Sequence, residues 1–187
     1  TCAPPFGYIM RDGKYYPDEE SGKANIVREV FTLYSNGVKQ REIALYLAEK
    51  GIRTRYGKKP ENRWVDYMLH NHCYIGKIRW CPDGTKAVSK RKLDNENIMI
   101  VDGHHEPIIS MELWEKVQKL LEEQKRAYSK YAKRQQPVEH MLKGLVRCSA
   151  CGGTLAVNGT SGKAKVRCLQ CCNYSRGSCT TSHSVLL

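Results

Sequence analysis

The residues of this chain with the clearest chemistry are cysteines, which number nine in 187 residues. Cys148 and Cys151 are separated by two residues and are followed by Gly152 and Gly153, which let the backbone turn beneath the two sulfurs. Two thiolates at this spacing can chelate one tetrahedral metal ion. We therefore predict that Cys148 and Cys151 are ligands of a zinc ion.

The second half of this metal site is open, because Cys168, Cys171, Cys172 and Cys179 compete for two positions. Spacing favours Cys168 with Cys171, which completes a second C-x2-C pair. The alternative is Cys168 with Cys179, and the small residues before Cys179 would let the chain return to the metal. Four thiolates leave no open coordination position, so the predicted zinc is structural rather than catalytic.

Disulfide bonds are the competing explanation for these cysteines. Their number is odd, no secretory segment is visible, and their fraction is below that of disulfide-rich scaffolds. The sequence therefore favours zinc and a reducing compartment.

The charge of the chain predicts a polyanionic partner. The net charge is +12 and the isoelectric point is about 9.3, and from Glu139 onward six Lys and Arg face one acidic residue. Each phosphate that a Lys or Arg neutralises releases a condensed counterion, which drives binding to nucleic acid. No apolar run approaches the length of a membrane span, so we expect no membrane partner.

Hydrophobic periodicity in the first half predicts a hairpin and three helices. An Asp-Gly turn joins short strands at Tyr8–Met10 and Tyr15–Tyr16. Apolar residues recur at helical spacing in Lys23–Asn36, Lys39–Lys50 and Asn62–Asn71. Short helices joined by tight glycine turns are typical of a helix-turn-helix unit.

The second half predicts strands and one long helix. Tyr74–Trp80 and Asn97–Val101 have the composition of strands. A helix should begin at Met111 and pass into a basic linker beyond Glu123, and Ser182–Leu187 resembles the start of another helix. The predicted fold class is α+β, with a helix-turn-helix-like domain at residues 1–135 and a small zinc β-ribbon domain at 136–187, which needs metal because its core is small.

Three basic regions are candidates for DNA contact. The loop Ile52–Arg63 is the most basic, the outward face of the third helix could meet base edges in a major groove, and Thr85–Leu93 could clamp phosphates. The residues that we expect to contact double-stranded DNA are Arg53, Arg55, Lys58, Lys59, Arg63, Tyr67, His70, Lys90, Arg91, Arg134, Arg147, Lys165 and Arg167.

Several short strings, in this order and spacing, resemble the DNA-binding half of the large serine recombinases, the group that includes phage integrases and transposon resolvases. The strings span nearly the whole chain: Pro5-Phe6-Gly7-Tyr8, Ile26-Val27-Arg28-Glu29-Val30-Phe31, Glu42-Ile43-Ala44, Tyr74-Ile75-Gly76, Glu106-Pro107-Ile108-Ile109, and Leu142-Lys143-Gly144-Leu145 before the first cysteine pair.

This resemblance implies a recombinase domain followed by a zinc ribbon, which together grip one half of a DNA attachment site. In the family's ribbon the third cysteine follows a short strand and the fourth precedes a Ser-His-aliphatic tail. The resemblance therefore selects Cys148, Cys151, Cys168 and Cys179 as the zinc ligands, although Cys171 and Cys172 depart from the common pattern.

The resemblance also implies which parts of such a protein lie elsewhere. The family's serine nucleophile belongs to a resolvase-like domain, and its self-association uses regions that we do not find in this sequence. We expect this chain to bind attachment-site DNA without cutting it, as part of a cytoplasmic bacterial or phage protein. A transcriptional regulator built from the same two modules is the alternative function.

Overall fold

The computed structural model describes residues 4–80, 98–131, 142, 144–161, 166–182 and 184–186. Two features predicted from the sequence lie outside these residues: the basic segment Thr85–Leu93 and the domain boundary near residue 135. The chain forms two compact units, Thr1–Lys39 with Val65–Arg126 and Gln40–Trp64 with Ala127–Leu187. We call them the first and second unit and describe each by itself.

A hairpin opens the first unit, as the Asp-Gly turn predicts. Strands β1 (Tyr8–Arg11) and β2 (Lys14–Pro17) pair in antiparallel register. Between them Asp12 has φ 50° and Gly13 has φ 75°. Two consecutive positive φ angles are what a tight two-residue hairpin turn requires.

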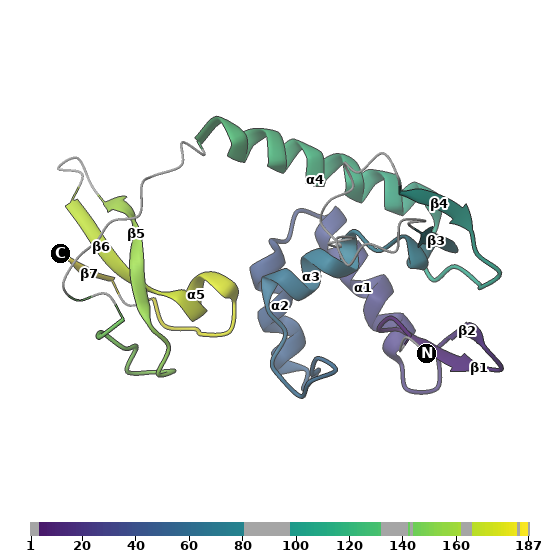
Figure 1. Cartoon of the computed structure of the whole chain (residues 1–187), viewed down its shortest axis with the longest axis horizontal. Coiled ribbons are helices and arrows are strands. Elements are labelled where there is room, and N and C mark those ends of the chain that lie inside the picture. Colours follow the sequence, from purple (N-terminus) through teal and green to yellow (C-terminus); the bar gives the residue numbers. More distant parts are fainter. Residues whose placement is uncertain are drawn as a thin grey trace. The chain divides into compact units, whose positions relative to one another are not determined.

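Helices α1 and α4 both contribute buried apolar residues to the first unit. Helix α1 (Lys23–Ser35) buries its apolar stripe, and α4 (Met111–Tyr131), the long helix in Figure 1, buries Trp114 and Val117. The rings of Phe31 and Trp114 stack with centroids 5.9 Å apart, and the Tyr34 hydroxyl donates to Gln124 at 2.9 Å. The two predicted amphipathic helices therefore pack against each other.

The predicted strand Tyr74–Trp80 begins later than expected. Its first residues form a 3-10 helix, η1 (His72–Ile75), and only β3 (Lys77–Trp80) is extended, paired with β4 (Met99–Asp102). The Asn71 side chain accepts from the Cys73 N–H, and Gly76 ends the turn at φ 76°. This local capping overrides the strand propensity of Tyr74, which becomes a core residue.

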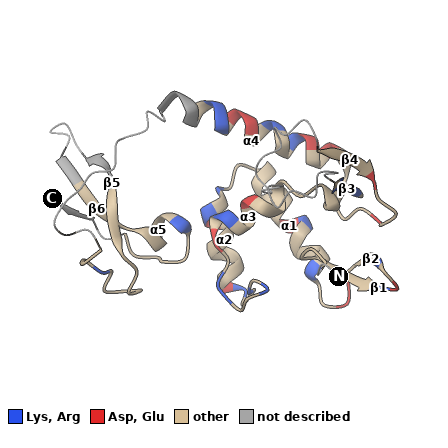
Figure 2. Cartoon of the chain, in the orientation of Figure 1, with Lys and Arg blue, Asp and Glu red and all other residues tan. Residues whose placement is uncertain are grey.

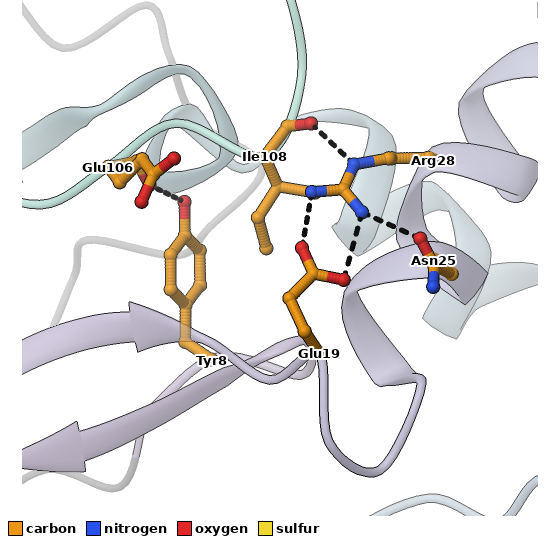
Figure 3. A network of polar contacts seen from close by, with 6 residues as sticks. All are labelled: Tyr8, Glu19, Asn25, Arg28, Glu106 and Ile108. Atoms are coloured by element: carbon orange, nitrogen blue, oxygen red, sulfur yellow. Dashed lines mark hydrogen bonds and ion pairs between the residues drawn. The ribbon is translucent and has the colours of Figure 1, made fainter.

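A polar network fastens three segments of the first unit together (Figure 3). The Arg28 guanidinium contacts Glu19 through both Nη atoms, donates to Asn25 at 2.7 Å and donates through Nε to the Ile108 carbonyl at 3.3 Å. The Tyr8 hydroxyl lies 2.9 Å from the carbonyl oxygen of Glu106. The network joins β1 and α1 to the segment that precedes α4.

Asp18 anchors the start of α1, and we expect it to make the stability of the first unit depend on pH. Its buried carboxylate accepts from the Ser21 hydroxyl and N–H and from Lys23 Nζ, and these bonds lower the pKa of Asp18. The ionised form is the stabilised one, so its contribution is complete above about pH 5 and is lost as pH falls through the lowered pKa. We expect Asp18→Asn to reduce the free energy of unfolding by about 1–3 kcal/mol at pH 7.

Urea denaturation from neutral to acid pH checks this expectation, because the difference between wild type and Asp18→Asn should shrink toward zero in acid. Glu20→Gln is the matched control, since the Glu20 carboxylate is exposed and forms an ion pair with Arg11, whose side chain is exposed as well. A difference that stays constant with pH would contradict the role of the Asp18 charge.

The second unit contains α2 (Gln40–Glu49), the start of α3 (Asn62–Leu69) and a three-stranded sheet. The sheet has the order β5 (Leu155–Ser161), β6 (Val166–Cys171) and β7 (Ser184–Leu186), and the short helix α5 (Cys172–Arg176) follows β6 (Figure 1). These elements confirm the predicted α+β class.

Ser184–Leu186 form the strand β7, so the helix start predicted at Ser182–Leu187 is wrong. Strand β7 pairs with β6 in antiparallel register, with Val185 opposite Leu169. Pairing with a distant strand decides the conformation of this three-residue element. Among the helices of the described residues, none has the length and apolar character needed to cross a bilayer.

Candidate metal centre and nucleic-acid interface

Four cysteines of the second unit converge on one point. The sulfur atoms of four cysteines all lie within 4.8 Å of one another: Cys148, Cys151, Cys171 and Cys179. A tight turn presents the first pair, because the Gly152 N–H donates to the Cys148 carbonyl at 2.8 Å and Gly152 has φ 67°. The first cysteine pair therefore lies as its spacing predicts.

The second pair is held by β6 and α5. Cys171 is the last residue of β6, and Cys179 follows α5, whose C-terminal Gly177 has φ 86°. The N–H groups of Ser178 and Cys179 both donate to the Asn173 carbonyl, at 2.9 and 3.1 Å. These bonds turn the chain after α5 so that Cys179 returns to the cluster.

The chemistry and size of this cluster fit a zinc ion. Four sulfurs at about 2.3 Å from a tetrahedral ion lie about 3.8 Å from one another. The sulfurs of Cys151 and Cys171 are 3.5 Å apart, and three of the four cysteines are buried. Since four thiolates would close the coordination shell, such an ion has no position for a substrate.

Two thiols of the cluster differ in their protonation. The Gly153 N–H, with further help from the Asn173 amide and the neighbouring thiols, lowers the pKa of Cys151 to about 6. Burial raises the pKa of Cys171 to about 11. A metal binds thiolates, so its binding here would release protons.

The cluster departs from the predicted ligand set at one position. The structure brings Cys148, Cys151 and Cys179 together but places Cys171, rather than Cys168, with them. Cys168 and Cys171 are three residues apart on β6, and residues an odd number apart on a strand point to opposite faces. Cys168 is buried within the strand and pairs in register with Leu186.

The predicted DNA-binding loop joins α2 to α3 and carries exposed cations. Figure 2 marks basic residues in blue along this loop, where Arg55, Lys58 and Lys59 are exposed. Arg53 has another role, because its Nη1 donates to the carbonyls of Ala48 and Ile52 at 3.2 and 2.8 Å. Arg53 therefore caps the C-terminus of α2, where a positive charge is favourable.

The residues in α3 and directly after it that we predict to contact DNA differ in their exposure to solvent. Arg63 is exposed, whereas Tyr67 and His70 are half-buried. His70 Nδ1 lies 2.8 Å from the Asp66 carbonyl and 3.5 Å from the Asp66 carboxylate. His70 is thus held against its own helix.

The remaining predicted DNA contacts belong to the ribbon and to undescribed segments. Arg147 is exposed next to Cys148 and forms an isolated bridge with Thr154. Arg167 pairs in register with Thr160. Four predicted residues lie outside the described part of the chain: Lys90, Arg91, Arg134 and Lys165.

A family model and a curated protein that match this sequence are both described as recombinases. The family model described as Recombinase matches residues 21–124, more than half of the chain. A putative DNA recombinase of Bacillus subtilis (strain 168) is 29% identical over an alignment of 177 residues, which covers 80% of this chain and 34% of that protein.

A solved structure gives a likeness of fold. A structure described as "Crystal Structure of a LSR-DNA Complex" matches with a TM-score of 0.50 and 22% identity, over 91% of this chain and 48% of that one. Another, described as "Sequence Requirements of the Listeria innocua prophage attP site", has a TM-score of 0.48 and 23% identity, over 90% of this chain and 64% of that one. The chain spans about a third of the curated relative and about half of the first structure.

Proposed function

Because this chain belongs to the Recombinase family, we propose that it binds double-stranded DNA as part of a site-specific recombinase. The membership confirms the recombinase resemblance that the sequence motifs indicated. The family match at residues 21–124 is the observation that carries the proposal, and this range includes α2, α3 and the basic loop between them.

We also propose which DNA the chain binds and which of its domains contact that DNA. The target is one half of an attachment site, bound by a recombinase domain at residues 1–135 and by a ribbon domain at 136–187. The cations Arg55, Lys58, Lys59 and Arg63 support this, since all four are exposed and exposed Lys and Arg can neutralise phosphates. Arg147 offers a similar cation on the ribbon.

A zinc ion is part of the same proposal. Cys148, Cys151, Cys171 and Cys179 would hold one ion, which supplies cross-linking of the ribbon rather than chemistry. Three of these cysteines form a buried cluster with Tyr174 packed against it, so an ion held by their sulfurs would link the segments that carry them. Small domains of this size are commonly stabilised by a structural metal.

The salt dependence of DNA affinity tests the proposal. In fluorescence anisotropy with a labelled duplex, we expect log K to fall linearly with log salt concentration, by about 0.9 for each phosphate contact. Lys58→Gln with Lys59→Gln should weaken binding and make the slope shallower by up to about 1.8. The slope becomes shallower because each phosphate contact that is lost means that fewer counterions are released when the chain binds DNA.

A matched control removes the same charge from another element. Lys116 and Lys119 are exposed on α4, where Figure 2 shows blue residues alternating with red ones. Since the neighbouring acids there reduce the local potential, Lys116→Gln with Lys119→Gln should leave the slope nearly unchanged. Binding that ignores salt, or failure to bind any duplex at low ionic strength, would refute the proposal.

A further inference from the structure

The loop between α2 and α3 carries an aromatic residue with no internal role in the described structure. The Tyr56 side chain is 81% exposed, more than any other large apolar residue that the structure describes. An apolar surface held in water is unfavourable. Solvation explains the exposed cations of this loop but does not explain the tyrosine.

Tyr56 lies on a well-built turn. The Gly57 N–H donates to the Thr54 carbonyl at 2.9 Å, and the Thr54 N–H donates to the Lys58 carbonyl at 2.8 Å. The Lys58 N–H also donates to Thr54 Oγ1 at 3.2 Å, and Gly57 has φ 73°. These three bonds fix Arg55 and Tyr56 at the tip of the turn.

Both ends of the loop are fastened to the second unit. At the first end the Ile52 N–H donates to the Leu47 carbonyl at 3.0 Å, and at the other end Pro60 is fully buried. Because the backbone of this turn is already fixed, the Tyr56 side chain loses little conformational freedom when it binds a partner. The turn is therefore suited to presenting its tip.

The residues around Tyr56 indicate the chemistry of that partner. The exposed neighbours Arg55, Lys58 and Lys59 are all cations, and the nearest acid in sequence, Glu61, is half-buried. Cations bind phosphates, while an aromatic ring can pack against the sugars and bases between them. An apolar protein surface would not require three flanking cations.

We propose that Tyr56 is a DNA contact residue whose ring packs against a base or sugar in a groove, while Arg55, Lys58 and Lys59 hold neighbouring phosphates. This inference rests on the proposed DNA binding, and it adds a contribution to the affinity that does not come from charge. Because the ring is neutral, its contribution to affinity is independent of salt, in contrast to that of the three cations.

The test measures affinity and salt slope separately, using the full zinc-loaded chain. The probe is the labelled duplex that this chain itself enriches most from a randomised library. We expect Tyr56→Ala to weaken binding by about 5- to 100-fold with an unchanged salt slope. Tyr56→Phe keeps the ring and should bind like wild type. Since Tyr56 is exposed, unchanged circular dichroism should show that the variants fold.

Tyr16→Ala is the matched control, because Tyr16 is also exposed but lies on β2. It should bind like wild type. Equal losses from Tyr56→Phe and Tyr56→Ala would overturn the ring contact in favour of the hydroxyl. Loss of binding to phosphatidylglycerol vesicles with unchanged DNA affinity would instead assign Tyr56 to a membrane surface and overturn the inference.

The outcome for wild type separates this inference from the proposed function. Wild-type binding with a steep salt slope, together with wild-type affinity for Tyr56→Ala, overturns the inference and leaves the proposed function standing. Absence of wild-type binding to the enriched and mixed-sequence duplexes overturns both.

Discussion

Replacing Cys171 with serine should abolish zinc binding, whereas replacing Cys168 with alanine should leave one zinc ion per chain. The reason is that the Cys171 sulfur belongs to the four-sulfur cluster and Cys168 lies on the opposite face of β6. Metal content per chain, measured by plasma mass spectrometry after dialysis, distinguishes the two variants. Cys172→Ser is a second control, because this half-buried residue adjoins Cys171 but lies outside the cluster.

The expected structural effect is large and local. Structural zinc sites contribute apparent binding free energies of about 10–16 kcal/mol, which is comparable with the whole stability of a typical domain, about 5–15 kcal/mol. Cys171→Ser, or a chelator added to wild type, should therefore remove the hydrogen-exchange protection of β6 and β7. The amides of α1 should stay protected, since α1 belongs to the first unit.

The opposite result has a clear meaning. If Cys168→Ala loses zinc and Cys171→Ser keeps it, the ion is held by the ligand set that the family resemblance implies, with Cys168 in place of Cys171. If both variants keep one ion with reduced affinity, the two cysteines exchange at the site. Either result would refute the ligand set that we propose.

The features that the sequence predicted well depend on local interactions. The hairpin at β1 and β2 follows from an Asp-Gly turn, and the bounds of α1 follow from helical periodicity that ends at Asn36-Gly37. The turn under Cys148 and Cys151 has the same origin. In each case residues close in sequence determine the conformation, so a pattern in a short window is informative.

The errors involve partners that are distant in sequence. The sequence prediction took Cys168 as a ligand and weighed Cys171 against Cys179 as its companion, whereas the cluster of the structure contains both Cys171 and Cys179. Which cysteine of β6 faces the cluster depends on the register of the strand, in which Cys171 pairs with Leu155 and Cys168 with Leu186. The strand β7 likewise exists because it pairs with β6. Spacing between cysteines carries no information on strand register, although an odd offset along a predicted strand would have shown that Cys168 and Cys171 cannot both face one ion.

Composition located the basic loop but not the state of its side chains. Arg53 looks like Arg55 in the sequence, yet its guanidinium caps α2. The sequence gives no signal that Tyr56 is exposed, because an aromatic residue is more often buried than exposed. Exposure and internal bonding are properties of the folded chain, and they divide the candidate contacts into available and occupied ones.

The second large effect should come from Tyr74, which lies at the centre of the first unit. Its side chain is 1% exposed, stacks on Tyr8 with centroids 6.1 Å apart and meets Phe31 edge-on at 5.9 Å. We expect Tyr74→Ala to reduce the free energy of unfolding by about 3–5 kcal/mol, because it leaves a cavity where an aromatic ring was packed. Urea denaturation of the zinc-loaded chain, followed by near-ultraviolet circular dichroism, measures this loss.

Tyr74→Phe separates the ring from its hydroxyl. The hydroxyl donates to the Phe6 carbonyl at 2.9 Å, and burial raises the pKa of Tyr74, so it stays a donor over the whole neutral range. Removing it leaves a carbonyl without this bond and should cost about 1–3 kcal/mol. Similar losses in the two variants would mean that the hydrogen bond, rather than ring packing, holds the N-terminal segment to this core. A clearly smaller loss for Tyr74→Phe would mean that aromatic packing around Tyr74 determines the stability of the first unit.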